Sequence, residues 1–145
     1  MKKAGFSLIE VLVAIILIGL AIAALVAASS SFTRANAAGA ELTTAEFLIE
    51  QIRELTATLL YDASHNELYD FVGADGVQSF CPPIGADGND LDGFAAFTQQ
   101  VTVKNVSGSD LEQVVGYDSG FVRVSVEVSL NSRPISSVSW IRAKY

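Results

Sequence analysis

The stretch that decides the fold of this chain lies near its beginning and reads GFSLIEVLVA over residues 5–14. It opens an apolar run, Phe6–Ala28, which only Ser7 and Glu10 interrupt. About 20 apolar residues are enough for a helix to cross the hydrocarbon core of a bilayer. A carboxylate at that depth costs about 2.5–3.5 kcal/mol on insertion scales, so Glu10 is expected to have a partner. The run therefore predicts one membrane-spanning helix that carries a functional charge.

The residues around the run indicate how it is used. Lys2 and Lys3 on the short N-terminal flank predict that this end stays in the cytoplasm. One alternative is a secretory signal peptide, for which Ala35-Asn36-Ala37 could serve as the cleavage site. A simple membrane anchor is another alternative. The run is longer than the apolar region of a usual signal peptide, and neither alternative accounts for Glu10.

Residues 2–14, KKAGFSLIEVLVA, resemble the processing site of type IV pilins and type II secretion pseudopilins. This resemblance implies that a prepilin peptidase cleaves between Gly5 and Phe6 and methylates the new N-terminus, which gives an N-methylphenylalanine. It also implies three regions. Residues 1–5 are a leader peptide, residues 6–28 are the transmembrane and filament-core half of a helix, and residues 29–145 form a periplasmic or extracellular pilin-like domain.

The resemblance also gives Glu10 a partner. Cleavage exposes an ammonium group at Phe6, and the carboxylate of Glu10 can pair with that group on a neighbouring subunit in an apolar filament core. Removing one member of such a buried pair costs roughly 3–5 kcal/mol. The pair would therefore control how neighbouring subunits align and which subunits are recruited. Gly5 suits a peptidase that needs close approach to the backbone. The implied partners are the peptidase, other pilin or pseudopilin subunits, an assembly platform in the bacterial inner membrane, and lipid before assembly.

The remaining sequence predicts a helix followed by a small sheet. Apolar residues at steps of three and four continue the first helix to about residue 60: Leu42, Ala45, Ile49, Ile52, Leu55 and Leu59. Residues 61–97 are rich in Gly and Pro and predict loops, with a short edge strand at Val77–Cys81. Three further strands are expected at Ala96–Val106, Phe121–Leu130 and Ile135–Ala143. We therefore expect an α+β, pilin-like fold, with helix 6–60 packed on an antiparallel sheet of three or four strands.

Composition argues against several other kinds of site in these 145 residues. The net charge of −7 disfavours direct nucleic-acid binding. The single Cys81 excludes an intrachain disulfide. If the domain lies outside the cytoplasm, we expect Cys81 to be a buried small apolar residue, and the alternatives are a free thiol and an intermolecular bridge. The only histidine, His65, is expected on the surface, and no catalytic or cofactor-binding motif is present, so an enzyme is not expected. Weak calcium candidates lie in one loop, where an ordinary turn is the preferred interpretation: Asp87, Asn89, Asp90 and Asp92.

These observations favour a structural subunit of a filament, most like the PilV-like or type II secretion I-type minor members of the family. A type II secretion pseudopilus, a type IV pilus and a DNA-uptake pseudopilus all remain open as its destination. The alternative is a membrane-anchored adhesive or ligand-binding domain that does not assemble, with its site in the loops of residues 61–97.

Overall fold

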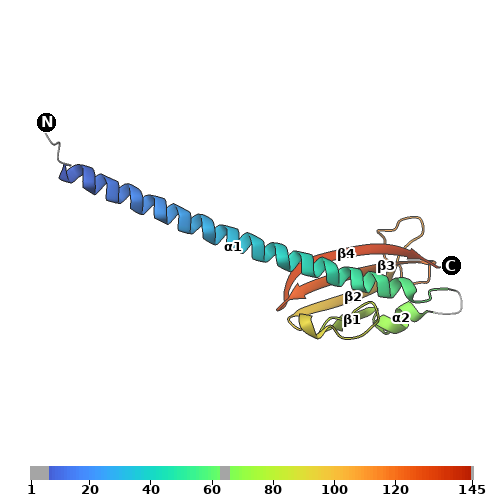
Figure 1. The fold of residues 1–145 in the computed structure, drawn as a ribbon. Coiled ribbons are helices and arrows are strands. Elements are labelled where there is room, and N and C mark those ends of the chain that lie inside the picture. Colours follow the sequence, from blue (N-terminus) through green and yellow to red (C-terminus); the bar gives the residue numbers. More distant parts are fainter. Residues whose placement is uncertain (1–6, 63–65, 145) are drawn as a thin grey trace. The chain divides into compact units, whose positions relative to one another are not determined.

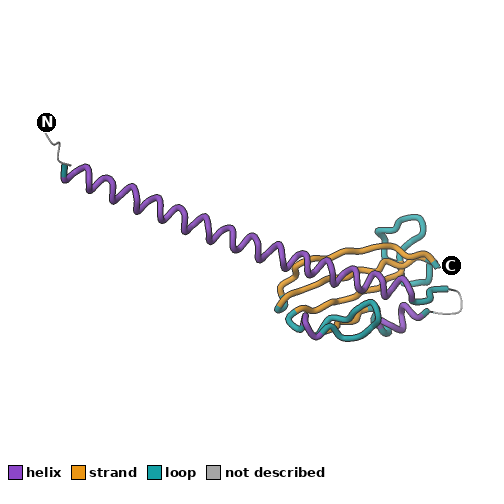
Figure 2. Tube along the Cα trace, in the orientation of Figure 1, coloured by secondary structure: helices purple, strands orange, loops and turns teal. Residues whose placement is uncertain are grey.

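The computed structural model describes residues 7–62 and 66–144, and its elements are labelled in Figure 1. The helices are α1 (Leu8–Thr58) and α2 (Glu67–Val72), with a short 3-10 helix at Asp92–Phe94. The strands are β1 (Val77–Phe80), β2 (Phe97–Asn105), β3 (Phe121–Leu130) and β4 (Arg133–Ala143). One long helix followed by an antiparallel four-stranded sheet confirms the α+β, pilin-like prediction (Figure 2).

The chain divides into two compact units, Met1–Ala40 and Glu41–Tyr145, and α1 contributes to both. In the first unit every described residue, from Ser7 to Ala40, is exposed. In the second unit α1 buries one side, which includes Ala45, Leu48, Ile49 and Ile52. The division at residue 28 predicted from the sequence concerns the membrane boundary, and it stays a prediction.

The sheet is an antiparallel meander in the order β1-β2-β3-β4. Its register places Val101 opposite Val126, and Val126 opposite Val138. The β3–β4 hairpin turns on Asn131 and Ser132, both with positive φ, as a tight two-residue hairpin turn requires. This turn lets β4 begin at Arg133, two residues before the predicted start.

The core lies between the sheet and the second-unit part of α1, which crosses one face of the sheet (Figures 1 and 2). The alternation predicted for residues 121–130 is confirmed, because four β3 valines are fully buried: Val122, Val124, Val126 and Val128. Val101 and Val103 of β2 extend the same apolar layer. Leu42, which the helical spacing placed on this face, is 43 % exposed.

Two features of residues 61–97 differ from the predictions. The short helix α2 lies in a region predicted as loops, and it forms because Leu68 and Val72 are buried in the core. Cys81 is exposed, so the prediction of a buried residue was wrong. The reason is its position: Cys81 directly follows β1, the edge strand of the sheet, and precedes a cis peptide bond to Pro82.

One buried polar side chain attaches α1 to the sheet. Gln99 of β2 is fully buried, and its amide nitrogen donates to the carbonyl oxygens of Leu48, at 2.9 Å, and Ile84, at 3.2 Å. Its amide oxygen accepts the backbone N–H of Ile84 at 2.8 Å. A single side chain therefore joins β2, α1 and the segment that follows β1.

We expect Gln99→Leu to lower the free energy of unfolding by about 2 kcal/mol, because it leaves the buried N–H of Ile84 without an acceptor. Urea unfolding of the full chain in detergent, followed by the fluorescence of the single tryptophan, Trp140, measures this change. The matched control is Gln100→Leu at the next position, where the side chain is exposed and should change stability by less than about 0.5 kcal/mol. Equal effects of the two substitutions would contradict the role assigned to Gln99.

Candidate functional site

The candidate site predicted from the sequence begins just before α1. Gly5 and Phe6, the predicted cleavage and methylation residues, lie outside the described residues, and their roles stay predictions. Ser7 is the residue before the helix. Its hydroxyl oxygen accepts the N–H of Ile9 at 3.3 Å, and its carbonyl oxygen accepts the N–H of Glu10 at 3.0 Å.

Ser7 and Glu10 have the spacing of a capping box, in which Ser or Thr caps a helix and Glu stands three residues later. Glu10 is consequently in the first turn of α1, where the partial positive charge of the helix N-terminus favours a carboxylate. In the sequence, Ser7 interrupts the apolar run and belongs to the resemblance at residues 2–14, and its spacing from Glu10 also carries the signal for the helix start. The structure thus gives Glu10 a favourable position within one subunit before any pairing between subunits.

The apolar side chains around Glu10 are uncovered. Leu8, Val11, Leu12, Ile15 and Ile16 line one continuous surface on α1. Within the described part of the chain, α1 is the one helix that is long and apolar enough to cross a membrane, and its most apolar window has no buried residue. Large exposed apolar surfaces of this kind mark contacts with lipid or protein.

Three of the weak calcium candidates, Asp87, Asn89 and Asp90, lie in the loop before the 3-10 helix, and Asp92 is the first residue of that helix. The carboxylate of Asp87 accepts hydrogen bonds from Asn89, at 3.1 Å from the backbone N–H and 2.8 Å from the side-chain amide. These bonds from Asn89 hold the pKa of Asp87 below its usual range. Among residues 7–62 and 66–144, no group of three or more His, Cys, Asp or Glu side chains is placed to hold a metal ion. The carboxylate of Asp87 is thus already engaged by hydrogen bonds within its loop.

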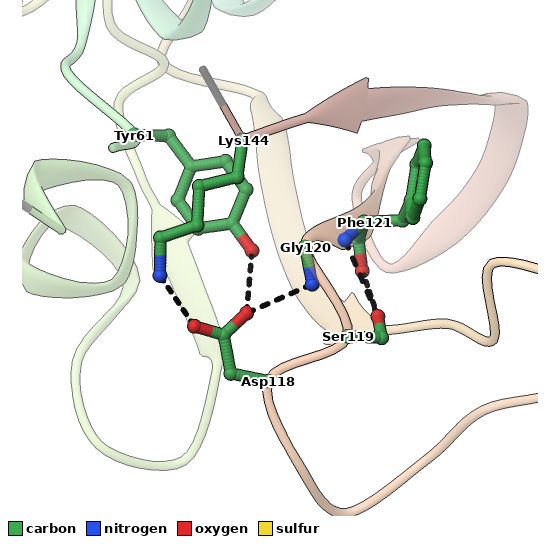
Figure 3. A network of polar contacts seen from close by, with 6 residues as sticks. All are labelled: Tyr61, Asp118, Ser119, Gly120, Phe121 and Lys144. Atoms are coloured by element: carbon green, nitrogen blue, oxygen red, sulfur yellow. Dashed lines mark hydrogen bonds and ion pairs between the residues drawn. The ribbon is translucent and has the colours of Figure 1, made fainter. Parts of the chain in front are cut away.

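A polar cluster that the sequence analysis did not identify lies where β4 ends (Figure 3). Asp118, in the connection between β2 and β3, accepts hydrogen bonds from Tyr61 at 3.4 Å and from the N–H of Gly120 at 3.0 Å. It also forms an ion pair with Lys144, whose ammonium lies 5.5 Å from the ring centre of Tyr61. The cluster joins the segment after α1, the β2–β3 connection and the residue after β4, so it holds the end of the chain in place.

The pKa values in this cluster reflect its contacts. Hydrogen bonding from Lys144 and from the N–H of Gly120 lowers the pKa of the Asp118 carboxyl. Burial and the nearby charge of Asp118 raise the pKa of Tyr61 to about 12. Tyr61 therefore stays a neutral hydrogen-bond donor, and Asp118 stays a charged acceptor, over the whole physiological pH range.

A second contact connects β4 to the end of α1. The α1 helix has no basic residue in its last turn. Arg142 of β4 supplies a positive charge there, donating to the carbonyl oxygen of Leu59 at 3.0 Å and to that of Thr56. Cations are favourable near the carbonyl end of a helix, so this contact stabilises the end of α1. No local sequence pattern could have predicted it, because Arg142 lies more than 80 positions from both carbonyls.

Comparison with known proteins identifies the N-terminal segment. Residues 1–26 match the family model of the prokaryotic N-terminal methylation motif, which is the class III prepilin signal of type IV pilins and pseudopilins. A search of curated proteins and a search of solved structures each found no match to the chain. The motif supports a pilin-like or pseudopilin structural subunit, processed by a prepilin peptidase and assembled with other pilin subunits. Together with the apolar helix, it indicates a membrane-anchored protein.

We expect Asp118→Asn to remove a small stabilisation, about 0.5–1 kcal/mol, because the Asp118 side chain is half-exposed. The folded-state pKa of Asp118 is lowered, so this stabilisation is complete above the unfolded-state pKa, about 3.9, and is lost as the pH falls through the folded-state value. Urea unfolding at pH 7 and at pH 2.5 measures it. The variant should be less stable than the original chain at pH 7, and the difference should shrink at pH 2.5.

The control is Asp75→Asn, an exposed aspartate for which we expect no such difference. A difference for Asp118→Asn that is equally large at both pH values would show that the ion pair with Lys144 is not its source.

Proposed function

We propose that this chain is a minor structural subunit of a type II secretion pseudopilus or a type IV pilus. The observation that carries the proposal is the methylation motif at residues 1–26, joined to a helix whose residues 8–40 are all exposed. A chain that leaves this much apolar surface uncovered needs lipid or other helices around it. The motif supports a proposal in which the helix meets these two environments one after the other, a bilayer first and a bundle of like helices afterwards.

Processing supplies the group that Glu10 lacks. Hydrolysis of the peptide bond between Gly5 and Phe6 releases residues 1–5 and leaves an α-ammonium on Phe6, which methylation keeps cationic. Glu10 has no ion-pair partner among the residues that the structure describes, and α1 presents it on an exposed surface. In the proposed filament, the Phe6 ammonium of one subunit pairs with Glu10 of the next, and the apolar surface beside Glu10 packs at the same contact.

The proposed orientation follows the charges that flank the helix. Lys2 and Lys3 hold the N-terminus in the cytoplasm, so the second unit lies in the periplasm before assembly. This arrangement puts Gly5 and Phe6 within reach of a peptidase acting at the cytoplasmic face. It also puts the sheet on the side of the membrane toward which a filament grows.

The processing step is tested by mass spectrometry of the protein from cells with and without an active prepilin peptidase. With the peptidase, we expect a chain that begins at Phe6 and carries one N-terminal methyl group. Without it, we expect Gly5 to remain attached to Phe6. An N-terminus at Ala38 in both strains would indicate a signal peptidase and would remove the basis of the proposal.

Assembly is tested with Glu10→Gln, which keeps the size of the side chain but removes its charge. We expect membrane insertion to be unchanged and incorporation into cross-linked filaments to fall at least tenfold, because the Phe6 ammonium would be buried without a counter-charge. Glu46→Gln is the matched control, since Glu46 is an exposed carboxylate on the same helix. Membrane monomers from the unaltered chain, under conditions where filaments form, would favour the anchored adhesive domain instead.

A further inference from the structure

The spacing of charges along α1 predicts how deep the helix lies in a membrane. This depth, called the membrane register below, differs from the depth that the limits of the apolar run would predict. Between Glu10 and Arg34, a stretch that lies wholly within α1, no residue is charged. The 24 residue steps between them correspond to about 36 Å of helix. The hydrocarbon core of a bilayer is about 30 Å thick, and a helix tilt of about 20° shortens 36 Å only to roughly 34 Å. Both charges can therefore lie just outside the core at the same time.

Of the four hydroxyl side chains between Ala28 and Arg34, those of Ser31 and Thr33 are hydrogen-bonded within α1. The hydroxyl of Ser31 donates to the carbonyl oxygen of Ala27 at 3.1 Å, and that of Thr33 donates to the carbonyl oxygen of Ser29 at 3.0 Å. Hydroxyl groups that are hydrogen-bonded within their own helix can enter lipid without leaving a donor unsatisfied. The last apolar residue of the run, Ala28, is thus not the last residue that hydrocarbon can accommodate.

The residues next to Arg34 fit a boundary between hydrocarbon and headgroups. Phe32 is 71 % exposed and offers a large apolar ring on the hydrocarbon side of Arg34. On the other side, residues 35–40 are small or neutral and supply no other charge. No ion pair joins Arg34 to any residue within the two described ranges, so its guanidinium is available to an external anion. A guanidinium binds phosphate oxygens through paired N–H donors.

We propose that Arg34 binds the phosphate of phospholipid headgroups in the outer leaflet and so fixes the depth of α1, with Glu10 at the inner edge of the hydrocarbon core. The proposal rests on the proposed function for its orientation, with the N-terminus in the cytoplasm. It differs from a register centred on the apolar run, Phe6–Ala28. The midpoint of the charges is Ile22, whereas the midpoint of the run is Leu17, so the two registers differ by about 7 Å in depth.

The proposed register changes the environment of Glu10 before assembly. With Ile22 at the midplane, Glu10 lies about 18 Å away, outside the half-thickness of roughly 15 Å. With Leu17 at the midplane, it lies about 10 Å away, inside the hydrocarbon. Arg34 thus keeps Glu10 at the headgroup layer of the opposite leaflet, where its carboxylate remains hydrated until the Phe6 ammonium of another subunit replaces the water.

Ile9 and Ser30 distinguish the two registers, because each lies inside the hydrocarbon in one register and outside it in the other. In the proposed register, Ser30 lies inside the hydrocarbon, about 12 Å from the midplane, and Ile9 lies outside, at about 20 Å. In the run-centred register, the two distances are reversed. Ile9→Cys and Ser30→Cys, each combined with Cys81→Ser, provide single attachment sites for a nitroxide label.

The experiment measures label depth in the full chain, reconstituted in phosphatidylglycerol vesicles, from relaxation by oxygen and by a water-soluble nickel complex. We expect the label at residue 30 to be relaxed by oxygen and the label at residue 9 by nickel. Adding Arg34→Gln should shift the depth of both labels by about 7 Å in the same direction across the bilayer, whereas Arg53→Gln, which removes the same charge from the second unit, should shift neither. An unchanged depth with Arg34→Gln would overturn the proposal.

Vesicles of a galactosyl diacylglycerol with the same acyl chains test the phosphate itself. We expect these vesicles to reproduce the Arg34→Gln depths, because their headgroups have no phosphate. Equal depths in both lipids would overturn phosphate binding. A helix that inserts in the run-centred register would overturn this inference and leave the proposed function intact. Nickel access at both positions would show that the helix does not insert, and it would contradict the inference and the proposed function together.

Discussion

The structure depends on one constraint: a single helix has to serve two environments, and the chain can bury only part of it. The second unit covers Ala45, Leu48, Ile49 and Ile52 with a sheet of valines, whereas every residue from Ser7 to Ala40 is exposed. No rearrangement of a small sheet could cover a helical segment of that length on all sides. The first part of α1 is therefore stable only in surroundings that other molecules provide, and this requirement makes anchoring and assembly two uses of the same surface.

The distribution of charge follows from this division. The second unit holds every acidic residue except Glu10, and it is strongly acidic, which favours solubility and disfavours adhesion to anionic lipid. The first unit has net positive charge, because Lys2, Lys3 and Arg34 outnumber Glu10. The two units therefore differ in the sign of their net charge. Glu10 is the exception to this pattern, and it is also the residue for which we propose a role in assembly.

The parts of the fold that could be predicted from the sequence are those with a local period. The valines of β3 alternate without interruption, so the strand and its buried face followed directly from residues 121–130. The motif at residues 1–26 was equally local.

In contrast, the polar contacts join residues far apart in the sequence, such as Gln99 with Leu48 and Tyr61 with Asp118. Helix α2 was missed because six residues are too few to show a helical period among glycines and prolines. Cys81 was placed wrongly because cysteine is usually buried, a tendency that says nothing about the exposed end of an edge strand.

The distant contacts have a common consequence for the second unit. They attach the second-unit part of α1, residues 41–58, to the sheet at three levels. Glu41 pairs with Arg133 where this part begins, Leu48 bonds Gln99 in its middle, and Thr56 bonds Arg142 near its end. Arg53 adds a further contact, lying 5.1 Å from the ring centre of Trp140. Sliding this part of α1 along its axis would break all of these contacts together, and it would also shift the buried apolar side chains out of register with the valines. An axial load on the helix is therefore resisted by the second unit as one body, as a subunit needs if it is to be drawn out of a bilayer by its neighbours without unfolding.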